Sequence, residues 1–266
     1  MPRPKKTTPK EKTPKQKSPK AKDGPSEAAF LAGYDPRAYA PIAVTADVAL
    51  VSAFEGALHT LTIARNEPPH RGALALPGGF VRTHEPIEAT AARVLRDKAG
   101  ITGVFLEQLY TFGSPARDPR MRVLTVAYYA LVDRARFERL DAAPRVRVAR
   151  IEVPWEGETG GPVELRDETG RALTLAFDHA DILGMVVKRI RGKLGYAPIG
   201  FQLLPETFTL RELQEVHETV LGTRLNKDSF RRKMLASGDL EATGARQHDV
   251  GHRPAELYRF VRRSAV

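Results

Sequence analysis

Residues 76–101 read LPGGFVRTHEPIEATAARVLRDKAGI, in which a glycine-containing loop leads directly into a helical pattern. The apolar start runs into Pro-Gly-Gly, which is typical of a chain that leaves a strand. Within Ile87–Ala99, the spacing of Ala91, Leu95 and Ala99 places them on one face of a helix. Gly100 follows and is expected to end that helix. The stretch therefore predicts a strand, a loop and a helix in succession.

The segments on either side of this stretch are rich in strand-forming residues. They are Ile42–Phe54, Leu58–Arg65, Val104–Phe112, Met121–Val132, Val146–Val153 and Leu173–Phe177. A further helix is predicted at Asp181–Leu194, where apolar residues form a stripe. Strands gathered around a few helices indicate a mixed α+β sandwich rather than a doubly wound parallel sheet.

Five positions of the central stretch stand at the spacing of the Nudix box, G-x5-E-x7-R-E-U-x-E-E-x-G-U, in which U is apolar. They are Gly79, Glu85, Arg93, Gly100 and Ile101. Five matched positions in a strand–loop–helix context are far more specific than a lone pair of glycines. The chain thus resembles the Nudix family, and this resemblance implies an α/β/α sandwich that binds a nucleotide.

The three helix positions that hold Mg²⁺ in a Nudix box are altered in this chain. Acids at i, i+3 and i+4 share one helix face and hold the metal against a diphosphate. The chain has Val94, Asp97 and Lys98 there, so one acid remains, one position is apolar and one has the opposite charge. We therefore predict no metal site, no catalytic residue and little or no hydrolase activity. Without the resemblance, Glu85 and Glu88 belong to a solvated first helical turn, and Arg93 with Asp97 forms an i,i+4 surface pair.

A second motif lies in the loop at residues 110–120, which reads YTFGSPARDPR. It resembles the corresponding loop of Nudix-related transcriptional regulators of NAD metabolism, the NrtR-like group. Arginine suits bidentate contact with phosphate, and an aromatic ring stacks on a base. The predicted nucleotide-binding residues are Arg82, Phe112, Arg117, Asp118 and Arg120. The alternative is an ordinary hairpin loop that contains a salt bridge.

The C-terminal residues predict a helix, a turn, a basic helix and a β-hairpin in that order. The first helix is Thr209–Leu221, with Thr209 and Glu212 at the spacing of a capping box. The second helix, Lys227–Ala236, is expected to bury an apolar side formed by Phe230, Met234 and Leu235. The predicted DNA-binding residues are Lys227, Ser229, Arg231, Arg232 and Lys233 on this helix, with Arg246 and Arg253 in the hairpin loop.

This order is typical of a winged helix, in which the basic helix enters the major groove and the hairpin tip lies along the backbone or in a minor groove. Asp239–Thr243 and Leu257–Val261 are the predicted hairpin strands. The run Phe208–Phe260 resembles the C-terminal domain of the same NrtR-like group, including LNKDSFRRK and RPAELYRF. The alternative is a small helical dimerisation or docking domain. His217 is expected on the surface of its helix.

The basic character of the chain is concentrated in its N-terminal tail. Of a formal net charge of +10, residues 1–22 supply nine basic side chains and one acidic side chain. Residues 1–28 are predicted to be disordered, either as a solvated tail or as a polycationic arm for DNA phosphates. We expect the Nudix-like domain at 29–200 and the winged helix at 201–266. The absence of cysteine excludes disulfides and thiolate metal sites, and no apolar run is long enough for a membrane span.

Together these features predict a transcriptional repressor that binds operator DNA through the winged helix. The resemblance implies control by ADP-ribose or another NAD-related nucleotide, no required cofactor, and a homodimer on a palindromic operator of genes for NAD biosynthesis or salvage. The expected location is the cytoplasm, at the nucleoid when DNA is bound. One alternative is a Nudix-type ADP-ribose or nucleoside-diphosphate pyrophosphatase with an accessory domain; another is a nucleotide-sensing interaction protein. The sequence leaves open which nucleotide binds and whether it releases or tightens DNA binding.

Overall fold

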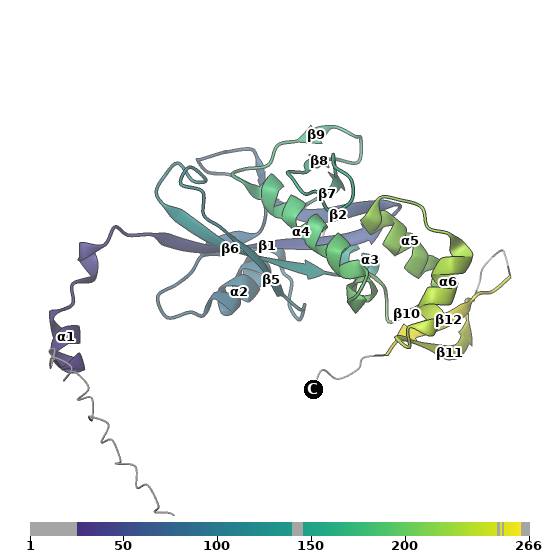
Figure 1. Cartoon of the computed structure of the whole chain (residues 1–266). Coiled ribbons are helices and arrows are strands. Elements are labelled where there is room, and N and C mark those ends of the chain that lie inside the picture. The colour runs from purple at the N-terminus through teal and green to yellow at the C-terminus, as the bar shows by residue number, and fades with distance from the viewer. Residues whose placement is uncertain (1–25, 140–145, 249–250, 252, 262–266) are drawn as a thin grey trace, which may run out of the picture. The chain divides into compact units, whose positions relative to one another are not determined.

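The computed structural model describes residues 26–139, 146–248, 251 and 253–261 (Figure 1). The chain forms two compact units, and the second starts at Ile42. In the first unit, helix α1 (Glu27–Gly33) is followed by a 3-10 helix, η1 (Pro36–Ala38). The tail predicted to be disordered lies, as far as residue 25, outside the described residues, and α1 begins within its last residues.

A mixed sheet forms the centre of the second unit, with strand order β5-β6-β1-β2-β7-β8-β9 and with β3 beside β2 and β4 beside β1 (Figure 1). Its strands are β1 (Ala43–Phe54), β2 (Ala57–Ala64), β3 (Leu74–Ala75), β4 (Gly78–Phe80), β5 (Glu107–Phe112), β6 (Val123–Leu131), β7 (Val146–Glu152), β8 (Glu164–Arg166) and β9 (Ala172–Leu173). The helices around it are α2 (Ile87–Ala99), α3 (Arg134–Glu138) and α4 (His179–Leu194). Strands β1 and β6 run parallel, and the other neighbouring pairs run antiparallel.

Side chains of β1 alternate between the two faces of the sheet, as strand geometry requires. Val48 belongs to the buried cluster that contains Leu95 of α2. Its neighbour Ala49 belongs to the opposite cluster, which contains Val186 of α4. Helices thus cover both faces of the sheet, and the α/β/α sandwich predicted from the sequence is confirmed.

The helices begin and end close to their predicted limits. Helix α2 spans the predicted Ile87–Ala99, and Gly100 closes it with a φ of 69°, a left-handed conformation that favours glycine. Helix α4 begins at His179 rather than at the predicted Asp181, because the Ile182 N–H donates to the Asp178 carbonyl at 3.1 Å and closes the first helical turn there. In the part of the chain that the structure describes, no helix is long and apolar enough to cross a membrane.

The C-terminal residues form a winged helix with a small sheet of strand order β10-β12-β11. After a 3-10 helix, η2 (Pro198–Leu203), its elements are β10 (Thr207–Phe208), α5 (Leu210–Leu221), α6 (Lys227–Ala236), β11 (Leu240–Arg246) and β12 (Glu256–Phe260). Thr209 and Glu212 form the predicted capping box at the start of α5. The side chain of Asn226 caps α6 by accepting a hydrogen bond from the Ser229 N–H. Figure 1 shows α6 beside the β11–β12 hairpin.

The winged helix shares its hydrophobic core with the face of the large sheet that α4 covers. Phe208, Leu213 and Phe230 belong to the same buried cluster as Ile182 and Ile190 of α4. Burial of a continuous apolar surface is the main favourable contribution to packing. The two domains therefore form one compact unit rather than two bodies joined by a bare linker.

Two side chains of the C-terminal helices lie differently from their prediction. His217, expected on the surface, is buried, because Gly200 from η2 packs closely against its ring and Phe230 stands edge-on to it at 5.0 Å. Leu235, expected in the core, is 46% exposed. It lies about 100° around the helix from Met234, which packs against the core near Phe230.

Arg191 joins α4 to α5 from a buried position. Its Nε donates a hydrogen bond of 2.8 Å to the carbonyl of Val220, and its Nη1 donates one of 2.9 Å to the carbonyl of Gly157. Its guanidinium also lies 4.8 Å over the ring of Trp155. Burial lowers the pKa of Arg191. Main-chain carbonyls and an aromatic face therefore stabilise a charge that links the sandwich to the winged helix.

We expect Arg191→Met to lower the free energy of unfolding by about 2–4 kcal/mol, because buried carbonyls lose a charged donor. Arg211→Met is the matched control, since Arg211 lies on the exposed side of α5 in an i,i+4 pair with Glu215. Its expected effect is below about 0.5 kcal/mol. Urea unfolding followed by circular dichroism measures both variants. Equal destabilisation would show that Arg191 does not hold the two helices together.

Candidate functional site

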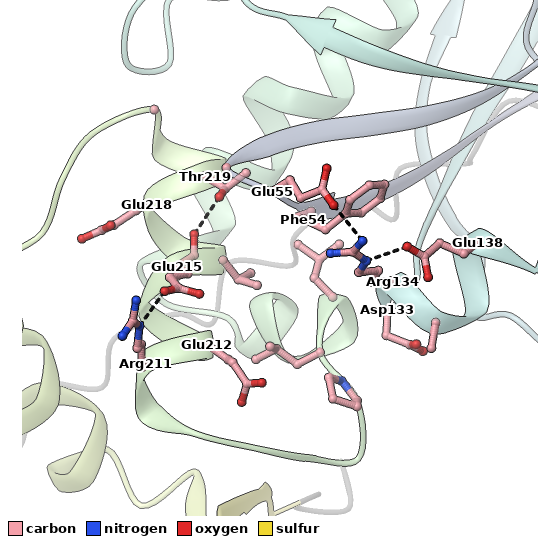
Figure 2. A pocket seen from close by; sticks show the side chains of 18 of the residues that line it. Phe54, Glu55, Asp133, Arg134, Glu138, Arg211, Glu212, Glu215, Glu218 and Thr219 are labelled. Carbon is pink, nitrogen blue, oxygen red and sulfur yellow. Dashed lines mark hydrogen bonds and ion pairs between the residues drawn. The ribbon is translucent and has the colours of Figure 1, made fainter. Parts of the chain in front are cut away.

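A groove of about 930 Å³ runs between the β1–β2 turn, α3 and α5 (Figure 2). Figure 2 shows Arg134 joined to Glu55 and Glu138, and Arg211 joined to Glu215. The acidic residues that line the groove are Glu55, Asp133, Glu138, Glu212, Glu215 and Glu218, and the basic ones are Arg134, Arg211 and Arg224. Because acidic residues predominate, the groove does not suit an anionic ligand such as a nucleotide.

A second cavity, of about 540 Å³, lies in the sandwich beside residues 76–80, which are called the glycine loop below and contain strand β4. Its charged lining residues are the acidic Asp47, Glu67, Asp97 and Asp118 and the basic Arg65, Lys98, Arg117 and Arg120. They come from β1, from the loop after β2, from the last turn of α2 and from the 110–120 loop. The cavity therefore brings together the two motifs that the sequence analysis singled out.

Arg117 is the buried centre of this cavity wall. Its Nε and Nη2 donate bidentate hydrogen bonds of 2.8 and 2.7 Å to Asp178, and its Nη2 lies 3.4 Å from Asp47 Oδ2. Burial tends to lower the pKa of Arg117, but the hydrogen bonds and charges of these two carboxylates raise it overall. The guanidinium stays charged and fixes the 110–120 loop to the start of α4.

His179 fixes the glycine loop to the same end of α4. The Leu76 N–H donates a hydrogen bond of 2.9 Å to its Nδ1, so the neutral ring carries its proton on Nε2. This Nε2 lies 3.9 Å from Asp47 Oδ2. Burial lowers the pKa of His179, although Asp47 and Asp178 act in the opposite direction. A neutral imidazole therefore ties the loop and the helix together within the cavity wall.

Cations and aromatic rings meet at the edge of the cavity. Arg65 lies 4.8 Å over the ring of Phe177, and Arg120 lies 5.8 Å over the ring of Phe80. Phe177 has a φ of 56°, which is uncommon for an aromatic residue and indicates a tightly determined local structure. Asp118 holds Arg120 through two side-chain hydrogen bonds, of 3.0 and 2.7 Å. This arrangement suits stacking on a base and charge contact with phosphate.

Glu85 and Arg93, which stand at two matched positions of the Nudix box, form an ion pair between the loop and the helix. Arg93 bonds to Glu85 at 2.7 Å and donates to the Phe80 carbonyl at 3.1 Å. The hydrogen bonds from Arg93 lower the pKa of Glu85 to about 2, and Thr90 adds to the effect. The surface pair between Arg93 and Asp97 is not formed, because Glu85 in the preceding loop takes the guanidinium and Asp97 pairs with Arg96 at 2.9 Å.

The three altered positions of the box do not fit a divalent metal. Val94 is buried and packs so closely against Gly79 that a Cβ there would stand 3.0 Å from Val94 Cγ2. The Lys98 ammonium donates a hydrogen bond to the Gly78 carbonyl. Although Lys98 is exposed as a residue, partial desolvation lowers its pKa, and Asp47 acts in the opposite direction. Within the described ranges, no three acidic or histidine side chains are placed to hold a metal ion.

The structure separates the predicted nucleotide-binding residues into two groups. Arg117, Asp118 and Arg120 line the cavity. Arg82 is exposed and is not part of its wall. Phe112 lines a different hollow, of about 400 Å³, which Asp178 also lines.

Sequence reasoning missed several residues of the cavity wall. They are Asp47, Arg65, Phe80, Phe177 and His179, together with Asp178, which pairs with Arg117 but lines the neighbouring hollow. A local feature pointed to the last three, since Phe-Asp-His directly precedes the apolar stripe of a helix. Asp47 lies within an apolar strand, and a buried acid of that kind indicates a specific partner.

The predicted DNA-binding residues gather on one helix and one hairpin. Lys227, Ser229, Arg231, Arg232 and Lys233 are all exposed on α6. Arg246 is exposed near the end of β11, and its Nη1 donates to the Pro254 carbonyl at 3.4 Å. Arg253 is exposed in the hairpin loop.

We expect the stabilising contribution of Glu85 to depend on pH. Its pKa in the folded protein lies below the ordinary value of about 4.3. The contribution is therefore present above that value and is lost as the pH falls towards 2. In urea unfolding, the difference in the free energy of unfolding between the unchanged protein and Glu85→Gln should decrease as the pH falls from 6 to 3. Glu88→Gln, at an exposed position in the first turn of α2, is the control. A difference between the unchanged protein and Glu85→Gln that does not change with pH would contradict the assignment.

Comparison with known proteins places both domains in families. Residues 42–156 match the NUDIX domain, and residues 200–260 match the NrtR DNA-binding winged helix domain. The "ADPR responsive transcriptional repressor NtrR" of Acinetobacter baylyi is 38% identical over 238 residues, which cover 89% of each chain.

Two solved structures resemble the whole chain. Shewanella oneidensis NrtR complexed with a 27mer DNA has a TM-score of 0.67 and 30% identity, covering 82% of this chain and 93% of that one. A MutT/nudix family protein from Enterococcus faecalis has a TM-score of 0.69 and 28% identity, covering 89% and 94%. With its two domains in the same order and a relative aligned over most of its length, the chain belongs to the NrtR family, in which a Nudix domain precedes a winged helix.

Proposed function

We propose that this chain is a transcriptional repressor that binds operator DNA through its winged helix and is controlled by ADP-ribose or another NAD-related nucleotide. The proposal rests on one observation: a single compact unit contains both an exposed basic helix and a nucleotide-sized cavity. The Acinetobacter baylyi relative is described as an ADPR responsive repressor, and the Shewanella oneidensis protein was solved with DNA. Both descriptions support the proposal.

Helix α6 supplies the DNA-binding surface in this proposal. Lys227, Arg231, Arg232 and Lys233 are exposed, and none of them is joined to a carboxylate within the described part of the chain. Because their charges are not consumed by protein partners, they are available to phosphates and to guanine edges. Arg246 and Arg253 on the hairpin reach the flanking backbone, as in other winged helices.

The cavity beside the glycine loop holds the nucleotide in this proposal. Its 540 Å³ fall in the range of small-molecule sites. Phe80 and Phe177 offer ring faces for the base, and Arg65 and Arg120 lie next to those rings. Arg117 contributes by positioning, because Asp178 already occupies its bidentate edge. Phe112 and Arg82 fall outside this cavity and contribute less.

Nucleotide binding is coupled to DNA binding through α4 in this proposal. One end of α4 carries His179 in the cavity wall, next to Asp178, which binds Arg117 of that wall. The other end carries Arg191, which donates to the Val220 carbonyl of α5. A change at one end of α4 therefore shifts the position of the winged helix against the sandwich. We further propose a homodimer whose two winged helices read half-sites of a palindromic operator. Genes of NAD biosynthesis or salvage are the proposed targets.

We propose that this family member has little or no pyrophosphatase activity. A Nudix hydrolase needs acids at the positions of Val94 and Lys98 to hold its metal, and the remaining Asp97 pairs with Arg96. Release of AMP from ADP-ribose in the presence of Mg²⁺ or Mn²⁺ would favour the alternative, an ADP-ribose pyrophosphatase with an accessory domain.

Arg231→Ala and Arg232→Ala should each weaken operator binding by about 5- to 100-fold, because each removes a contact to a base or a phosphate. Fluorescence anisotropy of a labelled fragment from upstream of the gene, at fixed salt, measures the affinity. Arg171→Ala removes the same charge from an exposed turn of the Nudix domain and serves as the control. Nucleotide affinity should stay unchanged in all three variants.

Unchanged operator affinity in both α6 variants would contradict the assignment of α6 as the DNA-reading helix. An equal loss in Arg171→Ala would mean that net charge, rather than the position of the arginine, determines the affinity.

A further inference from the structure

Lys98 stands where a Nudix box has the last of its metal-binding acids. It lies in the last turn of α2, one turn after the buried Val94, and it lines the cavity beside the glycine loop. Its ammonium donates to the Gly78 carbonyl, directly before the first glycine of the box. A positive charge therefore occupies the part of the cavity where a divalent cation would be expected.

The charge balance of the cavity changes with this one residue. Four acidic and four basic residues line it. With a glutamate at position 98 the lining would have five acidic and three basic residues, a surplus of two negative charges. One divalent cation would be needed to offset that surplus before an anionic diphosphate entered. With lysine the cavity is already balanced, and no metal is required for that purpose.

Three of the four carboxylates that line the cavity, all except Glu67, are already paired with arginines. Asp47 pairs with Arg117, Asp118 pairs with Arg120, and Asp97, the remaining acid of the box, pairs with Arg96. Most of the negative charge of the wall is thus neutralised by protein groups.

Two cations of the wall bond instead to main-chain carbonyls. Lys98 donates to Gly78, and Arg65 donates to Pro69 at 2.9 Å. A carbonyl is a weaker partner for a cation than a phosphate oxygen is. An ammonium on a flexible stem exchanges partners readily, so Lys98 is able to turn from the loop to a bound phosphate.

We infer that the Lys98 ammonium takes the place of the divalent cation, so that the cavity binds the diphosphate of its nucleotide without a metal. The inference rests on the proposed function, since it concerns the same cavity. It specifies a ligand with a diphosphate and a binding reaction that is independent of Mg²⁺.

Isothermal titration of the full chain with ADP-ribose tests the inference. One titration follows removal of divalent ions with EDTA, and a second contains excess Mg²⁺. The expected dissociation constants agree within about twofold. Because a charged hydrogen bond is lost, Lys98→Met should weaken binding in EDTA by about 10- to 100-fold. Lys98→Arg, which keeps the charge, should bind without metal to within about fivefold of the unchanged chain.

Lys98→Glu is the decisive variant, because it restores the acid of the box. It should bind ADP-ribose poorly in EDTA and recover at least about tenfold in affinity when Mg²⁺ is added. Recovery by metal also shows that the variant is folded. Lys188→Met is the matched control, since the Lys188 ammonium likewise donates to a carbonyl, that of Thr159 at 3.3 Å, but lines a different hollow.

The outcomes separate this inference from the proposed function. Binding by the unchanged chain that requires Mg²⁺ overturns the inference and leaves the nucleotide-controlled repressor intact. Equal binding in EDTA by Lys98→Met and the unchanged chain overturns it as well. Failure of the unchanged chain to bind ADP-ribose in either buffer overturns both the inference and ADP-ribose as the proposed effector.

Discussion

The buried guanidinium of Arg117 must be matched by carboxylates, and Asp178 and Asp47 supply them. Loss of one partner from such a buried pair typically costs about 3–5 kcal/mol, because an uncompensated charge remains. The pair therefore holds the 110–120 loop, β1 and the start of α4 in one arrangement. Helix α4 has 16 residues, a length of about 24 Å, and its far end holds Arg191 against α5. One end of α4 thus contributes to the cavity wall, and the other end holds the winged helix.

The features that the sequence predicted well are those determined by neighbouring residues. The limits of α2 follow from apolar periodicity and from Gly100 as a stop. The start of α5 follows from the capping box of Thr209 and Glu212. Each depends on contacts within four residues, which a linear pattern contains in full. The sandwich and the winged helix followed from the order of such elements.

The features that the sequence did not predict depend on residues far apart along the chain. Arg117 was expected to bind phosphate, but its bidentate edge meets Asp178, 61 residues later. The alternative interpretation paired Arg93 with Asp97 by helical spacing, whereas the partner of Arg93 is Glu85 in the preceding loop. His217 is buried because Gly200 comes close to it from another element. No local pattern encodes these approaches, since tertiary packing decides them.

Nucleotide binding and operator binding are proposed to be coupled through α4, which holds His179 in the cavity wall and Arg191 against α5. The most direct measurement of this coupling is the operator dissociation constant, by anisotropy at fixed physiological salt with excess non-specific DNA, with and without saturating ADP-ribose. Coupling predicts a change of about 5- to 150-fold in operator affinity, and the same factor in ADP-ribose affinity when the operator is bound. An operator affinity that stays the same while ADP-ribose is demonstrably bound would contradict the coupling.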